Sequence, residues 1–235
     1  MRIWAIGDLH LSTASPKPMD VFGAHWKDHA RRIAENCAKL VEPGDLLLLP
    51  GDLSWAMKRK DADLDLALIA GLPGVKVLCK GNHDYWWDSD RPLGFDGLFD
   101  TPFVSGDGRI GVAGTRGWTP LYDALTPQER VLSTKTIGKE LRRLEKRLVG
   151  IKDCQIKYAM IHYPPLPEFA PLLRSYGVGT VVYGHLHVGG DDPLPELWNG
   201  MRCICVAADR IRFTPRLLDI VVPESNPGIL QADDL

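Results

Sequence analysis

The sequence predicts a single α/β domain, on two observations. Short apolar runs recur along the chain and alternate with segments of helical periodicity, the pattern of strands joined by helices. The chain has 235 residues, enough for one large core, and no linker, internal repeat or low-complexity tract divides it. Its 45% hydrophobic and 25% charged residues are those of an ordinary globular protein, not of a disordered, collagenous or membrane protein.

Seven segments are expected to form strands. Five are short, mostly apolar runs that end at Gly, Pro or His, which favours strands buried in the core. They are residues 3–6, 46–49, 75–79, 158–161 and 178–183. Residues 110–113 and 202–213 are the other two, the second with a hairpin expected near Ala208 and Asp209.

Three helices are expected between these strands, over residues 25–40, 61–70 and 127–149. The third has the clearest start, because Thr126 can act as N-cap, Pro127 suits the first helical position, and Glu129 completes a capping box. Lys and Arg gather at its far end, where the helix dipole favours positive charge.

Charge and cysteine content narrow the class of protein. There are 28 basic and 30 acidic residues and a net charge of −2, which disfavours an extended nucleic-acid surface. The apolar run after Met1 is too short for a signal peptide. No apolar run in the sequence approaches the roughly 20 residues that cross a bilayer. The five cysteines include no Cys-x-x-Cys pair, so we expect buried free thiols and a cytoplasmic protein.

Side chains that suit metal binding follow the apolar runs. In open α/β sheets, ligands collect at the carboxyl ends of strands, so these residues are expected to converge. Imidazole and carboxylate groups together suit Mn, Fe, Zn, Ni or Co, whereas a closed structural zinc site normally uses thiolates. The residues are Asp8, His10, Asp52, Asn82, His83, Asp84, His162, His185 and His187.

The order of these blocks resembles the calcineurin-like metallophosphoesterase family. The matching text is Gly7-Asp8-Leu9-His10, Gly51-Asp52, Gly81-Asn82-His83-Asp84, His162 and Gly184-His185-Leu186-His187. The resemblance implies a four-layer αββα sandwich, which we expect over residues 1–222. Residues 223–235 are polar and acidic, which indicates a loosely held tail.

The resemblance also implies a binuclear centre of two divalent ions, with Mn the first expectation. One ion would be held by Asp8, His10, Asp52 and His187. The second would be held by Asn82, His162 and His185, with Asp52 bridging both. Two divalent ions, two carboxylates and one hydroxide leave the centre near +1, which suits an anionic phosphoryl group. The mechanism expected is in-line attack by metal-bound hydroxide, with unligated His83 protonating the leaving oxygen.

One departure concerns the residue that orients His83. Protein phosphatases of this superfamily carry a second Asp in the block Gly-Asp-x-x-Asp-Arg-Gly, and this chain has Trp55 at that position. The protein-phosphatase subgroup is therefore disfavoured. Asp84 either orients His83 or caps the following turn, and the sequence leaves both open.

Two further features have alternative roles. Arg116 lies between glycines after the 110–113 strand and either holds phosphate oxygens or forms a loop salt bridge. Tyr85, Trp86 and Trp87 either stack on a substrate ring or pack in the core.

The expected function is hydrolysis of a small phosphomonoester or phosphodiester, nucleotides included. The alternatives are a nuclease and a non-catalytic phosphate- or nucleotide-binding module on the same fold. The expected partner is a small phosphorylated substrate, without a membrane and without extended nucleic acid. Oligomeric state is left open.

Overall fold

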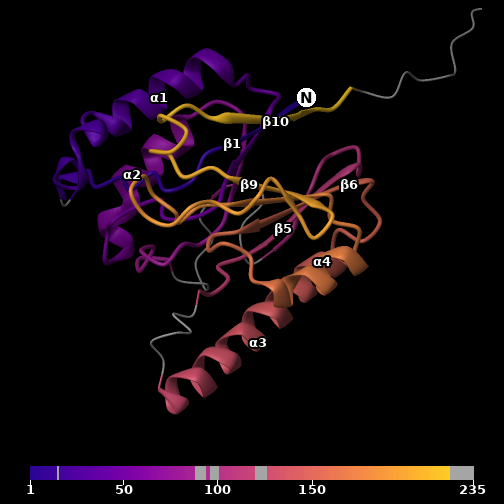
Figure 1. Cartoon of the computed structure of the whole chain (residues 1–235). Coiled ribbons are helices and arrows are strands. Elements are labelled where there is room, and N and C mark those ends of the chain that lie inside the picture. The colour runs from indigo at the N-terminus through magenta and orange to yellow at the C-terminus, as the bar shows by residue number, and fades with distance from the viewer. Residues whose placement is uncertain (15, 88–93, 96–100, 120–125, 223–235) are drawn as a thin grey trace, which may run out of the picture.

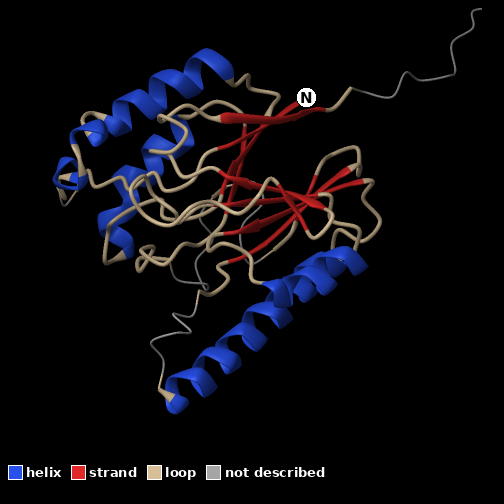
Figure 2. Ribbon diagram, in the orientation of Figure 1, coloured by secondary structure: helices blue, strands red, loops and turns tan. Residues whose placement is uncertain are grey.

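Two β-sheets form the centre of the molecule, and helices cover the outer face of each (Figure 1, Figure 2). This computed structural model describes residues 1–14, 16–87, 94–95, 101–119 and 126–222. The four layers, helix, sheet, sheet and helix, confirm the predicted αββα sandwich. The expected tail at 223–235 lies outside the described residues.

The first sheet has the strand order β10-β1-β2-β3. Strands β1 (Arg2–Ala5), β2 (Leu46–Leu49) and β3 (Val75–Leu78) are parallel, and β10 (Arg216–Ile220) pairs antiparallel with β1. Helices α1 (His29–Leu40) and α2 (Arg59–Gly71) are the crossovers between the parallel strands. Two short 3-10 helices, Met19–Phe22 and Ala24–Trp26, precede α1.

The second sheet has the order β4-β5-β6-β7-β9-β8. Its parallel centre contains β5 (Ile110–Thr115), β6 (Ile156–Ile161), β7 (Thr180–Tyr183) and β9 (Met201–Cys205). The edge strands β4 (Phe103–Val104) and β8 (Leu197–Trp198) are antiparallel to their neighbours. Helix α3 (Pro127–Val149), a 3-10 turn at Pro167–Phe169 and α4 (Ala170–Ser175) connect the parallel strands.

Alternating side chains of the second sheet pack into two apolar cores, one on each face of the sheet. In β6, Tyr158 and Met160 pack between the two sheets, while Ala159 and Ile161 pack beneath the helices α3 and α4. All four leucines of β2 are fully buried, as expected for a central parallel strand covered on both faces. The five cysteines are free, four of them buried. Within the described ranges, no helix has the length and apolar character needed to cross a membrane.

Most predicted elements are confirmed, and the third helix has both its predicted bounds and its capping box. The first helix begins at His29, not at residue 25, because Ala24–Trp26 form a separate 3-10 turn and the backbone of Lys27 (ψ 130°) and Asp28 (φ 56°) is not helical. The strand expected over 202–213 is also wrong. It ends at Cys205, the chain then turns through Arg212 and Phe213 at positive φ, and β10 follows in the other sheet.

Polar contacts tie the two sheets together at β10. Asp219 of β10 accepts a hydrogen bond from the buried Tyr158 hydroxyl of β6 and one of 2.8 Å from Arg202 Nη1 of β9. The carboxylate therefore satisfies a hydroxyl that would otherwise be buried without an acceptor.

Replacing this carboxylate should weaken the sandwich. We expect Asp219→Ala to lower the free energy of unfolding by about 1–2 kcal/mol, since the Tyr158 hydroxyl loses its acceptor. Urea denaturation followed by circular dichroism measures the change. As a control, Asp63→Ala removes an exposed i,i+4 pair with Arg59 and should cost less than about 0.5 kcal/mol. Equal losses in the two variants would contradict the role given to Asp219.

Candidate metal centre

The carboxyl ends of the parallel strands of both sheets meet at one place. Gly7, after β1, donates to the Val206 carbonyl at 2.8 Å and accepts from Ala208 N at 3.0 Å, which joins the end of β1 to the end of β9. The predicted ligands follow these strand ends. Asp8 and His10 follow β1, Asp52 follows β2, Asn82 follows β3, His162 follows β6, and His185 and His187 follow β7.

Backbone hydrogen bonds hold the loops in an unusual conformation. Asp8 N donates to Gly51 O at 2.9 Å, and His10 N donates to Asp52 O at 3.0 Å. Asp8, His10, Asp52 and His185 all have positive φ, between 46° and 68°. Such backbone is costly for residues other than glycine and is concentrated at functional sites, where the surrounding structure enforces it.

Two glycines allow the loops to approach the carboxylates. A Cβ on Gly184 would lie 2.2 Å from Asp8 Oδ2, and a Cβ on Gly81 would lie 2.1 Å from Asp52 Oδ1. Any larger residue at either position would displace a carboxylate, so these glycines are required by close approach.

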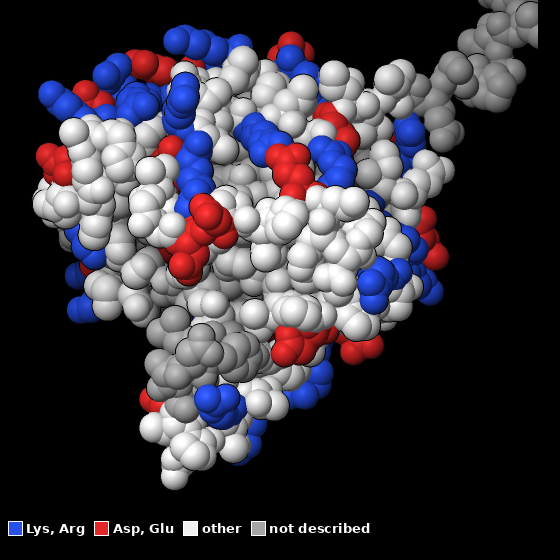
Figure 3. All heavy atoms as spheres, viewed as in Figure 1, with Lys and Arg blue, Asp and Glu red and all other residues white. Residues whose placement is uncertain are grey.

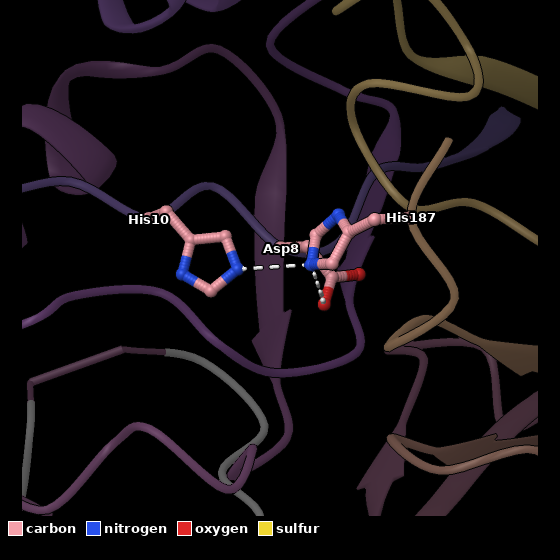
Figure 4. A group of neighbouring side chains, drawn as sticks. All are labelled: Asp8, His10 and His187. Carbon is pink, nitrogen blue, oxygen red and sulfur yellow. Dashed lines mark hydrogen bonds and ion pairs between the residues drawn. The ribbon is translucent and has the colours of Figure 1, made fainter. Parts of the chain in front are cut away.

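Asp8, His10 and His187 form one group of possible ligands, shown in Figure 4. His10 Nε2 lies 3.3 Å from His187 Nε2, which in turn lies 4.0 Å from Asp8 Oδ1. Asp8 and His10 are almost completely buried, and backbone His185 N donates to the Asp8 carboxylate at 3.0 Å. The three side chains point to a common space that one ion could occupy.

Asp52, His162 and His185 form a second group beside the first. His162 Nε2 lies 2.7 Å from Asn82 Oδ1 and 3.5 Å from Asp52 Oδ2. The same Asp52 oxygen lies 3.9 Å from His10 Nε2 of the first group. The other oxygen, Oδ1, accepts from His83 N at 2.8 Å. Asp52 therefore presents one oxygen between the two groups, the position of a bridging ligand.

The donor atoms suit divalent ions. His162 Nδ1 lies 3.0 Å from the Pro50 carbonyl, which can only accept, so this nitrogen carries the proton. The lone pair of Nε2 then faces two further acceptors, Asn82 Oδ1 and Asp52 Oδ2. Three acceptors that converge without a proton between them are the arrangement that a cation satisfies.

His187 is oriented in the same way by a carboxylate. Its Nδ1 lies 3.1 Å from Asp209 Oδ1, so Nε2 is directed towards Asp8 and His10. A carboxylate that holds the outer nitrogen of an imidazole is a frequent second layer around metal ions, where it fixes the tautomer. His10 Nδ1 is buried without a hydrogen-bond partner among the described residues.

Burial sets the charge of these groups. It lowers the pKa of His162 and of His185 to about 3 and that of His10 well below its ordinary value, so all three rings are neutral and can donate a lone pair. Burial also raises the pKa of Asp8 and of Asp52, because a charged carboxylate is costly in this setting. Cations at the two groups would remove that cost and keep both carboxylates ionised.

His83 lies beside both groups and belongs to neither. Its ring centroid is 4.2 Å from Trp55 and 5.7 Å from His10. Trp55 thus occupies the neighbourhood where the protein-phosphatase block would place an Asp. Burial lowers the pKa of His83, partly opposed by Asp52.

Asp84 has the contacts of a turn cap, one of the two roles that the sequence leaves open. The buried carboxylate accepts from Gly81 N at 2.8 Å, Leu53 N at 2.9 Å, Ser54 N at 3.1 Å and Trp86 Nε1 at 3.1 Å. These bonds hold the loop after β3 against the loop after β2, so Asp84 fixes the backbone that carries His83.

Arg116 lies next to the second group. Its carbonyl accepts from Tyr163 N at 3.1 Å, and its positive charge contributes to the lowered pKa of His162 after burial and the neighbouring histidines. Its Nε is buried without a hydrogen-bond partner in the described part of the chain, where no ion pair of Arg116 is found either. The expected alternative, a loop salt bridge, is therefore not seen among those residues.

The three consecutive aromatics divide between two roles. Trp86 and Trp87 are buried in the core between the sheets, so neither can stack on a substrate. Tyr85 is 59% exposed, with its ring 6.3 Å from that of His83.

Sequence reasoning missed two contributors. Asp209, expected in a hairpin, holds His187, and Trp26, expected in a helix, packs against His10 and His187 with centroids 5.8 and 5.6 Å away. Asp209 follows an apolar run as Asp8 and Asp52 do, and that signal could have identified it.

Comparison with known proteins agrees with this geometry. A family model described as calcineurin-like phosphoesterase matches residues 1–189. The fold is similar to that of a protein of unknown function from Aquifex aeolicus, with 17% identity and a TM-score of 0.50, over 92% of this chain and 95% of that chain. A purple acid phosphatase from yellow lupin (Lupinus luteus) seeds is more distant, with 15% identity and a TM-score of 0.43, over 80% of this chain and 38% of that chain. No curated protein matches the sequence.

The family match covers most of the chain and every residue of the two ligand groups. The chain therefore belongs to the calcineurin-like phosphoesterase family and is a metal-dependent hydrolase of phosphoric esters.

Proposed function

We propose that the chain hydrolyses a small phosphomonoester or phosphodiester at two divalent ions, with His83 as general acid. The position of Asp52 Oδ2 between the two ligand groups, 3.9 Å from His10 Nε2 and 3.5 Å from His162 Nε2, is the observation that carries the proposal. Interspersed basic and acidic side chains on the face in Figure 3 also favour a small substrate over a long polyanion.

Each group has the residues to hold one ion. Asp8, His10, Asp52 and His187 would hold the first, and Asn82, His162, His185 and the shared Asp52 would hold the second. When bound, such ions polarise the phosphoryl oxygens and lower the pKa of water. Mixed imidazole and carboxylate ligands suit Mn, Fe, Zn, Ni or Co, and manganese is our first expectation for both sites on the family resemblance.

His83 and Arg116 have separate tasks. His83 is outside both ligand groups and next to His10, so its imidazole can give a proton to the leaving oxygen. Arg116 lies by His162, and its buried Nε has no partner within the described ranges, so its guanidinium can bind phosphoryl oxygens that do not react. Asp84 acts as a positioning residue, through the backbone of the loop that bears His83.

Activity and metal content together test the proposal. The protein with added Mn²⁺ should hydrolyse p-nitrophenyl phosphate or its bis ester, and mass spectrometry of the metals should find about two ions per chain. Asp52→Asn weakens the bridging ligand, so it should lose at least one ion and most turnover.

The control is Asp63→Asn on the exposed side of α2, which should keep metals and turnover. An absence of turnover of either ester by wild type, across Mn, Fe, Zn, Ni and Co between pH 6 and 9, would refute the phosphoesterase proposal.

Removing the imidazole of His83 should leave the metals in place and lower kcat. We expect His83→Gln to lose about 100-fold or more with an alkyl phosphate, and much less with p-nitrophenyl phosphate, whose leaving group needs little protonation. The acid form is the active one, so wild-type kcat should fall as pH rises through the pKa of His83, and the variant should lack this decline. Equal losses with both esters would remove His83 from proton donation.

Loss of the Arg116 guanidinium should act mainly on substrate binding. We expect Arg116→Ala to raise KM about tenfold, the effect of one charge-assisted contact, and Arg116→Lys to recover part of it. Arg142→Ala on the exposed face of α3 is the matched control. Unchanged KM values in both Arg116 variants would assign this residue a structural role only.

A further inference from the structure

A pocket of about 350 Å³ opens beside the first ligand group. His10, His187 and His83 form its inner side. Its opposite side consists of apolar side chains from the segment before α1 and the loop after β2, namely Met19, Phe22, Trp26 and Trp55. Its volume is near the lower limit of ligand sites, roughly 300–1,000 Å³, and favours a group of one or two rings.

The two indoles of this pocket are fixed in place. Trp26 is 2% exposed and packs edge-on against Phe213, with centroids 5.1 Å apart. Trp55 stacks on His10 at 4.7 Å, and its Nε1 donates to Met19 Sδ at 3.1 Å. The Lys17 ammonium lies 3.2 Å above the Trp55 ring. These contacts hold the pocket in shape before anything binds, which reduces the entropy that binding must overcome.

At the rim of the pocket the aromatic surface is open to solvent. Phe22 is 60% exposed, and the neighbouring Val21 is 71% exposed. Two adjacent exposed apolar side chains beside a catalytic centre are the kind of surface that a ligand covers.

The carboxylate in the pocket wall is already engaged. The Asp209 carboxylate in its wall accepts from His187 Nδ1 at 3.1 Å and from Val188 N at 2.9 Å, so it is committed to positioning His187. An ammonium group would lose its hydration against the apolar walls, whereas an uncharged ring would contact them favourably.

We propose that this pocket binds the alcohol part of the substrate and selects a planar aromatic ring there. The inference rests on the function proposed above, because a leaving oxygen protonated by His83 places its carbon skeleton at the mouth of this pocket. Aromatic rings gain from contacts with the exposed Phe22 ring and with the edge of Trp55 beyond simple burial, which distinguishes them from saturated rings of similar size.

Binding of phosphonates, which have no cleavable ester bond, tests the subsite without turnover. Calorimetric titration of the full chain with Mn²⁺ would compare benzylphosphonate, cyclohexylmethylphosphonate and ethylphosphonate. We expect the Kd of benzylphosphonate to be about tenfold below that of ethylphosphonate and about threefold below that of cyclohexylmethylphosphonate. A nucleoside 5′-phosphonate then distinguishes the source of the ring: tighter binding than benzylphosphonate indicates a nucleotide, and weaker binding an aryl ester.

Variants locate the effect in the pocket. Phe22→Ala changes an exposed side chain, and Trp55→Leu keeps an apolar side chain without the ring. Each should reduce the preference for benzylphosphonate over ethylphosphonate to about threefold or less, since that preference comes from ring contacts. Leu132→Ala, 63% exposed on the distant face of α3, should retain the wild-type ratio.

Two results overturn the inference. One is equal binding of the three phosphonates, and the other is cyclohexylmethylphosphonate binding as tightly as benzylphosphonate, which would make the site apolar without aromatic selection. Hydrolysis of p-nitrophenyl phosphate and of its bis ester, measured across the metals and pH range given above, separates the two proposals. Turnover without ring preference refutes the subsite alone, and ring preference without turnover refutes the hydrolytic function alone.

Discussion

The hydrogen bonds of Gly7 to Val206 and Ala208 join the ends of the two sheets, and the metal centre depends on them. Each ligand group takes residues from both sheets: Asp8 and His10 with His187, and Asp52 with His162 and His185. If one sheet were shifted relative to the other at this edge, the side chains of each group would no longer lie close enough to bind one ion. Gly7 also passes so near Pro50 that a Cβ would lie 2.9 Å from its ring, so a larger residue would disturb the junction.

The loops at the junction have a strained backbone and buried charged groups, and the rest of the fold must offset the free energy that these cost. Four of the proposed ligands have positive φ, and burial raises the pKa of the two carboxylates, Asp8 and Asp52. Asp84 holds three of the loop amides, but burial and the nearby Asp52 charge raise its own pKa to about 7. Bound divalent ions would offset the cost of burying the charged carboxylates of Asp8 and Asp52. We therefore regard metal binding and the stability of these loops as coupled.

Local signals in the sequence were sufficient for much of this structure. The N-cap Thr126, Pro127 and Glu129 determine where α3 begins, and all three act within one helical turn. The proposed ligands were predictable because each follows closely after the end of a parallel strand. In β2, for example, the strand ends at Leu49, three residues before Asp52. What could not be predicted depends on contacts distant in sequence. Asp209 binds His187, which is 22 residues earlier in the chain. Strand β10 forms because it pairs with β1, at the other end of the chain.

Trp55 contacts His83 and also lines the aromatic pocket. A carboxylate at this position would favour the protonated imidazole of His83 and raise its pKa. An indole does the opposite, because it excludes water from the ring without supplying negative charge, and burial is the main cause of the lowered pKa of His83. The same indole contributes to the wall of the aromatic pocket. A bound ring against Trp55 would bury His83 further while the substrate phosphate brings negative charge towards it. Under the two proposals made above, recognition of the leaving group and control of the proton that it receives would both depend on the Trp55 side chain.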